Sequence, residues 1–352
     1  MAHDPWMIYG ANGYTGKLLA ELAVEKGLHP LLAGRSESKI RPIAEKLGLE
    51  YRAFDLGDPM AAAKGIKEVD LVMHCAGPFS ATSAPMVEAC LKTGTHYLDI
   101  TGEIEVFEAI HARTQEAKKS GSVLMPGVGF DVVPSDCLAA SLARALPDAT
   151  ELELALGGFG TASAGTAKTA VEGLPKGGRI RKNGRIIKVP TGHKAKEIQF
   201  SDKPRWCMAI PWGDVSTAYY STGIPNITVY TSVPRAMSTM TRLSAPFMGV
   251  TALPAVQNFL KNQIEKRVKG PDEKLRRTGR VHLWGQVKND AGKVVTGTLD
   301  CPEGYRFTVL SAMASVERVL AGEVPGGAWT PSAAFGADFV TRLPETDLRV
   351  PT

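Results

Sequence analysis

The sequence predicts an α/β protein, in which a doubly wound parallel sheet is followed by a second, α+β domain built on a mostly antiparallel sheet. Two observations favour this fold class. Over residues 1–147, short apolar runs alternate six times with helical patterns, which is typical of a parallel sheet with helices on both faces. From Thr150 the pattern changes to strands joined by hairpin-like turns. A chain of 352 residues exceeds one ordinary core, so we expect two domains.

The first domain, residues 1–147, is defined by its apolar runs. The expected strands are 6–10, 30–33, 51–54, 70–75, 96–100 and 123–126. The expected helices are 15–26, 38–47, 59–66, 84–93 and 104–120, and a further helix at 134–146 leads out of the domain. Ligands of such sheets bind at the carboxyl ends of the strands.

The second domain, residues 148–304, contains two hairpin candidates. Asn183-Gly184 predicts a tight turn within 179–189, because both turn positions require φ > 0. The strands 281–288 and 294–299 form the second candidate. The remaining expected elements are strands at 150–156, 217–222 and 226–232 and a helix at 305–320.

The stretch GANGYTG, residues 10–16, stands at the first strand–helix junction. Gly10 permits the tight turn, Gly13 leaves room for a pyrophosphate beside the backbone, and Gly16 lets the helix approach the strand. In this context the motif predicts dinucleotide binding in a Rossmann-type domain, with a purely structural turn as the alternative. The other residues that we expect to contribute from this turn are Asn12, Tyr14 and Thr15.

The end of the second strand predicts which dinucleotide binds. A site for NAD(H) places an acid there to bind the ribose 2′-hydroxyl, and this sequence has none. Arg35 and Ser36 instead offer a cation and a hydroxyl to a 2′-phosphate. We therefore expect NADP(H) rather than NAD(H), with a merely solvated Arg35 as the alternative.

Two further loops complete the expected cofactor site. Asp55 follows the third strand and can accept from the adenine amino group, although Asp55 or Asp58 can equally cap the next helix. The loop after the fourth strand gives backbone access near the nicotinamide, through Cys75, Ala76, Gly77, Pro78 and Phe79. Neither His74 nor Cys75 has a partner at ligand spacing, so we expect no metal site.

Three acids follow the fifth and sixth strands and are the catalytic candidates. Asp131 is the first candidate for proton transfer, followed by Asp99 and Glu103. The alternatives are that these carboxylates bind a cationic substrate or tie the two loops together. The short-chain dehydrogenase mechanism is excluded, because no tyrosine has a lysine four residues later. Cys137 is expected to be a buried structural thiol rather than a nucleophile.

Composition limits the partners and the location. A net charge of +5 is far from the concentrated basic stripe of a nucleic-acid-binding protein, so we expect no nucleic acid. The five cysteines are scattered without a CxxC pair, which favours a reducing compartment. Because the first residues lack a basic start and a long apolar core, we expect a cytoplasmic protein.

Residues 243–260 contain no charged residue, and residues 261–280 then carry eight basic and three acidic residues. The prolines at 246 and 254 make this a poor membrane span. We expect a partly buried helical hairpin or a subunit contact. The alternative is a surface, within residues 243–280, that contacts a membrane or an apolar substrate.

Several phrases together resemble the saccharopine dehydrogenase-like oxidoreductases, especially the branch with trans-acting enoyl reductases and saccharopine dehydrogenase-like proteins. They are GANGYTG (10–16), AGR (33–35), CAGPF (75–79), THYLDITGE (95–103), GVGFDVVPSD (127–136) and GAWTPSAAFG (327–336). The resemblance implies a dimer formed through the second domain and a return of about residues 305–345 to the first. It also implies cofactor roles for Gly10, Asn12, Gly13, Gly16, Arg35, Ala76 and Gly77.

The resulting hypothesis is an NADP(H)-dependent oxidoreductase that transfers hydride to or from a C=N, C=O or conjugated C=C bond of a small-molecule or acyl substrate. One alternative is a trans-acting enoyl reductase for lipid or polyketide acyl chains. Another is a protein that binds NADP(H) as a sensor or scaffold without catalysis.

Overall fold

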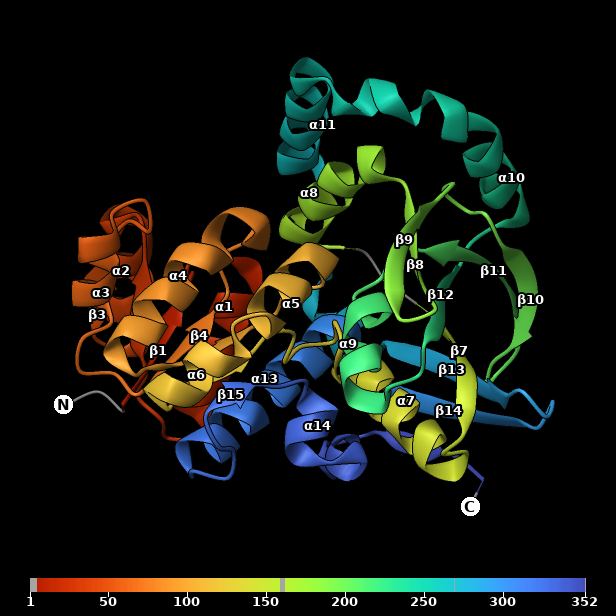
Figure 1. Cartoon of the computed structure of the whole chain (residues 1–352). Coiled ribbons are helices and arrows are strands. Elements are labelled where there is room, and N and C mark those ends of the chain that lie inside the picture. Colours follow the sequence, from red (N-terminus) through yellow and green to blue (C-terminus); the bar gives the residue numbers. More distant parts are fainter. Residues whose placement is uncertain (1–4, 159–161, 269, 352) are drawn as a thin grey trace. The chain divides into compact units, whose positions relative to one another are not determined.

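The computed structural model describes residues 5–158, 162–268 and 270–351, except for the side chains of 245–248. The chain forms two compact units, each built from two stretches of sequence (Figure 1). The first unit comprises Met1–Asp131 and Phe307–Ala334, and the second comprises Val132–Arg306 and Phe335–Thr352.

The first unit is built on a parallel sheet with the strand order β15-β6-β5-β4-β1-β2-β3. The strands are β1 (Trp6–Tyr9), β2 (Leu31–Gly34), β3 (Tyr51–Ala53), β4 (Leu71–His74), β5 (His96–Asp99), β6 (Val123–Met125) and β15 (Gly327–Ala328). The chain runs outward from β1 in both directions, so right-handed crossovers place helices on opposite faces. The predicted doubly wound parallel sheet is confirmed, and β15 adds a seventh strand from a distant part of the sequence.

Eight helices of the described chain lie wholly or mainly in this unit. They are α1 (Tyr14–Glu25), α2 (Glu37–Leu47), α3 (Pro59–Gly65), α4 (Phe79–Thr93), α5 (Ile104–His111), α6 (Thr114–Ser120), α13 (Gly304–Leu320) and α14 (Pro331–Phe335). The predicted helix at 104–120 is two helices, and the one predicted at 84–93 begins earlier, at Phe79.

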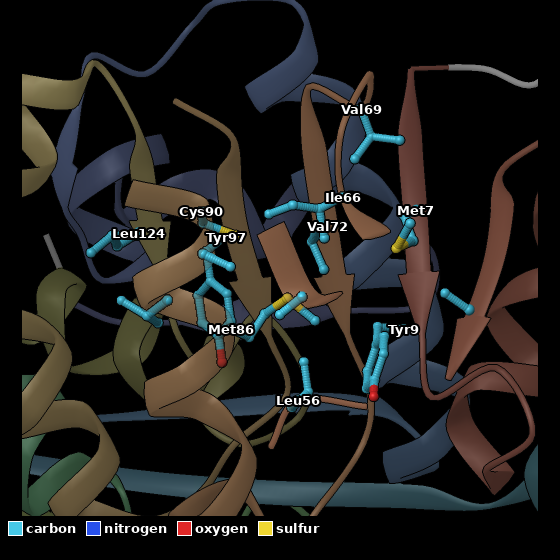
Figure 2. Packing of buried hydrophobic residues seen from close by; sticks show 14 of the residues in the cluster. Met7, Tyr9, Leu56, Ile66, Val69, Val72, Met86, Cys90, Tyr97 and Leu124 are labelled. Carbon is cyan, nitrogen blue, oxygen red and sulfur yellow. The ribbon is translucent and has the colours of Figure 1, made fainter. Parts of the chain in front are cut away.

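One face of the parallel sheet packs against α3 to α6 (Figure 2). Met7, Val72 and Tyr97 point from the strands toward Met86 and Cys90 of α4, and all five are fully or almost fully buried. Burial of such apolar side chains stabilises the sheet by roughly 1.5–3 kcal/mol each. This core fixes the strand ends from which the candidate site is built.

The second unit is built on a mixed, mostly antiparallel sheet with the order β10-β11-β12-β7-β13-β14-β16, as predicted. Among its described strands only β12 and β7 run parallel, and β8 and β9 form a hairpin beside β12. The strands are β7 (Ala149–Gly157), β8 (Gly178–Lys182), β9 (Arg185–Val189), β10 (Ala195–Gln199), β11 (Pro204–Ile210), β12 (Asn226–Ser232), β13 (Arg280–Asn289), β14 (Val294–Pro302) and β16 (Asp347–Arg349).

The second unit also contains helices on and around its sheet. They are α7 (Val133–Ala145), α8 (Ala164–Gly173), α9 (Asp214–Thr222), α10 (Arg235–Ser244), α11 (Pro254–Arg267), α12 (Glu273–Thr278) and the 3-10 helices η1 (Leu174–Lys176), η2 (Ala245–Ala252) and η3 (Ala337–Arg342). The sequence led us to place α7 within residues 1–147 of the first domain. In the structure α7 belongs to the second unit, because it packs on β13 and β14 so closely that a Cβ at Gly285 would lie 2.6 Å from Leu142 Cδ1.

One prediction for this unit is wrong. Residues 217–222 form the end of helix α9, not a strand, because Val215 and Ala218 bury one face of a helix between Gly213 and Gly223. Residues 243–260, expected as a partly buried helical hairpin or a subunit contact, form the end of α10, η2 and the first half of α11. Their described side chains are half-buried or exposed, and the subunit contact stays a prediction.

Candidate functional site

The turn between β1 and α1 is tight at each of its three glycines. Gly10 has φ of +89°, and a Cβ there would lie 2.7 Å from the backbone nitrogen of Ala76. A Cβ at Gly16 would lie 2.4 Å from Gly10 O, and one at Gly13 would lie 3.2 Å from the same oxygen. Larger residues at Gly10 or Gly16 therefore conflict with the neighbouring backbone.

The first turn of α1 lies directly behind these glycines. Gly13 is the N-cap, and no side chain caps the helix. The first N–H groups of a helix have no acceptors within the helix, and the helix dipole makes them attractive to phosphate. The turn thus has the bare backbone and the N–H groups that a pyrophosphate requires. The contributions of Asn12, Tyr14 and Thr15 to this turn's ligand stay predictions.

Arg35 and Ser36 follow β2 at the same edge of the sheet. Arg35 is exposed, and Ser36 is the N-cap of α2, with its Oγ at 3.1 Å from Ser38 Oγ. Burial, together with the charge of Asp55, raises the pKa of Tyr9 to about 12, and the charge of Arg35 opposes this shift. Arg35 and Asp55 therefore both lie near the carboxyl end of β1.

Asp55 is exposed and accepts a hydrogen bond from Gly57 N at 2.8 Å. The cap of the following helix α3 is Asp58, whose carboxylate accepts from Met60 N and Ala61 N. Of the two acids that the sequence offered as caps, Asp58 takes that role. The exposed carboxylate of Asp55 is left for the adenine contact that the sequence predicts, which stays a prediction.

The loop from Cys75 to Phe79 follows β4. Cys75 and Ala76 are half-buried and Gly77 is exposed, and the hydroxyl of Thr82 donates to Ala76 O at 2.6 Å. Burial, helped by the charge of Asp99, raises the pKa of Cys75 to about 12, so its thiol stays protonated near neutral pH. Cys75 is therefore suited to lining a site rather than to nucleophilic attack.

Glu103 holds the start of α4. Its carboxylate accepts from Phe79 N at 2.9 Å and from Ser80 N at 3.0 Å, and the residue is almost fully buried. A carboxylate at this position also interacts favourably with the helix dipole. Glu103 thus fixes the loop that carries Gly77 and Pro78.

Asp99, at the end of β5, is fully buried and has several hydrogen bonds. It accepts from the Tyr97 hydroxyl at 2.6 Å and, through its second oxygen, from Thr101 N and Gly127 N at 2.9 Å. Burial raises its pKa to about 6, although these hydrogen bonds act against the shift. Asp99 therefore ties together the loops that follow β5 and β6.

Asp131 differs from the other two acids. Its Oδ1 is buried without a hydrogen-bond partner, and burial alone raises its pKa to about 7. Its Oδ2 lies where a Cβ at Gly102 would approach within 2.6 Å. A carboxyl group with a pKa near neutral and an unsatisfied buried oxygen can hold and release a proton at physiological pH.

The loop that carries Asp131 is held by α13. The family resemblance implied that about residues 305–345 return to the first domain, but it did not identify these contacts. Thr308 Oγ1 accepts from Phe130 N at 2.9 Å, and Ser311 Oγ donates to Val128 O at 2.7 Å. A Cβ at Gly129 would lie 2.9 Å from Thr308 Cγ2. In the sequence, the only sign of these contacts is that helix α13 carries small and polar side chains. Such side chains do not reveal which residues they contact.

His74 is a second residue whose setting the sequence did not reveal. It is fully buried at the end of β4, stacks on Tyr9 at 5.5 Å and contacts Thr82 Oγ1 through Nε2 at 3.0 Å. Burial lowers its pKa to about 3, so the ring stays neutral.

Within the described residues, no group of three or more His, Cys, Asp or Glu side chains is arranged to hold a metal ion.

Arginine side chains commonly bind the carboxylate of a substrate. Three arginines of the second unit instead make contacts within the protein. Arg181 is buried, donates to Val215 O and Gly184 O, and lies 4.2 Å from the Tyr219 ring centroid. Arg205 forms a bidentate pair with Asp202, and Arg179 donates to Lys176 O and Gly178 O.

Cys137 is fully buried in α7, and burial raises its pKa well above the ordinary value. A thiol in this state is a weak nucleophile, which agrees with the structural role that the sequence predicts.

None of the helices in the described ranges is both long and apolar enough to cross a bilayer.

Part of the first unit is similar in sequence to known proteins. Residues 6–125 match the family model of the saccharopine dehydrogenase NADP binding domain. A saccharopine dehydrogenase-like oxidoreductase of Mus musculus is 31% identical over 150 residues, which cover 37% of this chain and 35% of the relative. A trans-acting enoyl reductase of Mycobacterium leprae (strain TN) is 33% identical over 138 residues, which cover 37% and 33%. The matched region thus spans about a third of each relative.

A solved structure extends the likeness in fold. The apo saccharopine dehydrogenase (L-Glu forming) of Saccharomyces cerevisiae matches with a TM-score of 0.68 and covers 99% of both chains, at 13% identity. At that identity the match establishes the fold and nothing further.

Proposed function

We propose that this protein is an NADP(H)-dependent oxidoreductase, because residues 6–125 match the NADP-binding domain of the saccharopine dehydrogenase family. The proposed reaction is hydride transfer to or from a C=N, C=O or conjugated C=C bond. The observation that carries the proposal is the bare glycine turn in front of the uncapped helix α1, in the same unit as the Asp131 carboxyl group with its pKa of about 7.

The chain's own residues divide into those that bind the cofactor and those that hold the binding loops. Gly10, Gly13 and Gly16 leave the backbone open to the pyrophosphate, and Arg35 with Ser36 binds the 2′-phosphate. Asp55 and the loop 75–79 line the adenosine and nicotinamide ends. When bound, NADP(H) supplies or accepts the hydride, and the protein contributes position and charge.

The proton that accompanies the hydride is assigned to Asp131. Asp99 and Glu103 follow as candidates, but their oxygens already accept hydrogen bonds from backbone N–H groups, which favours a positioning role. In the reducing direction, protonated Asp131 donates to the atom that becomes basic as the hydride arrives. In the oxidising direction, its carboxylate accepts that proton.

A second candidate function is that of a trans-acting enoyl reductase. It is favoured by the relative of that name and by the exposed apolar side chains of residues 237–259. An amino-acid imine would need cations for its carboxylates, and Arg179, Arg181 and Arg205 instead make contacts within the protein, which disfavours such a substrate. A non-catalytic sensor or scaffold is the third candidate, and the unsatisfied oxygen of Asp131 speaks against it.

The proposal also includes an oligomeric state and a cellular location. The family resemblance of the sequence implies a homodimer, which sedimentation velocity of the purified protein tests. All five cysteines are free, in keeping with a cytoplasmic, reducing location.

The decisive experiment is a fluorescence titration with NADPH and NADH of the wild type, Arg35→Ala and the control Arg41→Ala, another exposed arginine of the same region. Loss of charge-assisted hydrogen bonds predicts NADPH affinity about 10- to 100-fold weaker in Arg35→Ala, with NADH affinity unchanged. Equal affinity of the wild type for both cofactors overturns the NADP(H) assignment. No binding of either overturns the oxidoreductase proposal.

Catalysis is tested by NADPH consumption with imine, carbonyl and enoyl substrates. Binding without consumption of NADPH in any of these classes supports the sensor or scaffold instead.

A further inference from the structure

In the second unit, α10, η2 and α11 follow one another along one layer (Figure 1). Within the described residues, this layer carries most of the exposed large apolar side chains. Of ten such side chains in the described part of the chain, six lie in this layer, and they expose between 53% and 71% of their surface. They are Met237, Met240, Leu243, Val250, Leu253 and Phe259. We refer to these six residues as the 237–259 surface.

Helix α10 is oriented against the usual rule for a surface helix, which buries its apolar side. Met237, Met240 and Leu243 are exposed, whereas Ser238 is buried. Arg235 lies 4.8 Å from the Trp206 ring centroid and pairs with Glu197 at 3.1 Å. The helix therefore uses polar contacts toward the protein and presents methionine and leucine to the solvent.

Helix α11 also leaves apolar surface exposed, although its Val256, Leu260 and Ile264 are half-buried. Three polar contacts with α8 recur every four residues, so they lie on one side of the helix. Gln257 donates to Val171 O at 2.9 Å, Lys261 pairs with Glu172 at 2.6 Å, and Glu265 pairs with Lys168 at 2.9 Å. Leu253, just before the helix, and Phe259, within it, remain exposed, and no residue of α11 is fully buried.

The charge of this region indicates what covers the apolar side chains. Residues 235–280 contain ten Lys or Arg and three Asp or Glu, a net charge of +7. The whole chain carries +5, so all other residues together carry −2. Lys266, Arg267, Lys274 and Arg277 are exposed. The positive excess of the protein is thus concentrated in the segment that exposes its apolar side chains.

We propose that residues 235–280 dock on the surface of an anionic phospholipid bilayer. The 237–259 surface enters the boundary between headgroups and acyl chains, while the cations of α11 and α12 contact the headgroups. Pairing of this face with a second copy of the chain would bring two segments of charge +7 together, which disfavours self-association. The docking surface uses no residue of the proposed cofactor site.

The experiment is flotation of the full chain with vesicles of phosphatidylcholine and with vesicles containing phosphatidylglycerol. We expect binding to the anionic vesicles that weakens as salt is raised. A triple variant, Met240→Ser/Leu243→Ser/Phe259→Ser, should lower the partition coefficient at least about tenfold, since three apolar side chains no longer enter the bilayer. The matched control, Met60→Ser/Ile187→Ser/Val294→Ser, removes exposed apolar side chains elsewhere and should bind as the wild type does.

The electrostatic half of the proposal has its own pair of variants. Lys266→Gln/Arg267→Gln should weaken binding to anionic vesicles by about fivefold for each cation removed. The control Lys64→Gln/Lys67→Gln, also exposed, should leave it unchanged. An unchanged circular dichroism spectrum and melting temperature in every variant show that the fold is intact, so loss of vesicle binding is read independently of the proposed function.

Three outcomes overturn the proposal. Folded wild-type protein that floats with neither kind of vesicle has no bilayer contact. Equal binding to neutral and anionic vesicles, unaffected by the cation variants, removes the anionic specificity. A dimer in sedimentation velocity that the triple serine variant converts to a monomer shows that this face joins two copies of the chain.

Discussion

The carboxylate of Asp131 occupies space that exists because residue 102 is glycine: a Cβ at Gly102 would lie 2.6 Å from Asp131 Oδ2 and 3.2 Å from its Cβ. The two residues follow different strands, β5 and β6, and the close approach is fixed by hydrogen bonds from Thr101 N and Gly127 N to Asp99. The Asp131 carboxylate can thus take this position only because Gly102, on the neighbouring loop, has no side chain.

Replacement of Gly102 by alanine tests this dependence. The added methyl group displaces the Asp131 carboxylate, so turnover should fall by about 10- to 100-fold, since misplacement by about 1 Å costs that much. NADPH affinity should stay within about twofold of the wild type, because the glycine turn of α1 is untouched. Gly173→Ala is the matched control, as a Cβ there meets nothing within 4 Å. Unchanged turnover in Gly102→Ala would separate Asp131 from catalysis.

Replacement of Asp131 by asparagine tests the proton transfer. Wild-type reduction should be fast while Asp131 is protonated and should decline as pH rises through about 7. The variant Asp131→Asn should lose turnover and this pH step while keeping NADPH affinity, because the amide cannot release a proton. Glu50→Gln, which removes an exposed acid, is the control and should keep the step. Steady-state kinetics from about pH 5 to 9 provide the measurement, and an Asp131→Asn profile identical to that of the wild type contradicts the assignment.

The same substitution has a consequence for stability. Burial raises the pKa of Asp131 in the folded state to about 7 from the ordinary 3.8, so the unfolded state loses this proton first as pH rises. The contribution of Asp131 to the free energy of unfolding is therefore largest below about pH 4 and falls until about pH 7. Relative to the wild type, Asp131→Asn should gain thermal stability as pH rises between these limits. A stability difference that does not change with pH would show that the pKa of this carboxyl group is not shifted.

Glu103 provides a prediction about the fold. Glu103→Ala leaves Phe79 N and Ser80 N without their acceptor at the start of α4, and loss of such a cap costs about 1–3 kcal/mol. Thermal denaturation should show the loss. Glu103→Gln retains an oxygen and should recover part of it, and Glu105→Ala, an exposed acid two residues on, is the control. Equal melting temperatures for Glu103→Ala and the control would argue against the cap.

Thr308 tests the support of the Asp131 loop by α13. Thr308→Val keeps the shape of the side chain but removes the acceptor for Phe130 N, at an expected cost of about 1–3 kcal/mol. Hydrogen exchange at residues 128–131 should become faster, and turnover should fall more than NADPH affinity. Thr341→Val, on a 3-10 helix of the second unit, is the control. If exchange in the loop is unaffected, the loop is held by other contacts.

The sheet of the first unit was predictable from the sequence because its strands are short apolar runs separated by clear helical patterns. The β8–β9 hairpin was predictable too, since Asn183 and Gly184 both have positive φ, 49° and 76°. These features depend on neighbours in the chain. By contrast, β10 and β11 were missed. For β10 the reason is that AKEIQ has little apolar content and gives no sign of the strand with which it pairs.

The candidate site was predictable at the level of motifs but not of chemistry. The three acids Asp99, Glu103 and Asp131 look alike in the sequence, each following a strand. Only the packing shows that two accept hydrogen bonds from backbone N–H groups while an oxygen of Asp131 has none. The loop that carries Asp131 is moreover held by α13, which contacts it from 178 residues further along the chain.

The place of α13 and β15 in the first unit has a consequence for biosynthesis. Residues 1–131 leave the ribosome well before residues 307–334, which bring the last strand of their sheet and the helix that holds the loop after β6. At about 5–20 residues per second, translation of the intervening segment takes on the order of 10 s or more. During this interval the nascent cofactor-binding unit has an open edge at β6, where chaperones or premature pairing compete, so residues translated early are among the last to complete their fold.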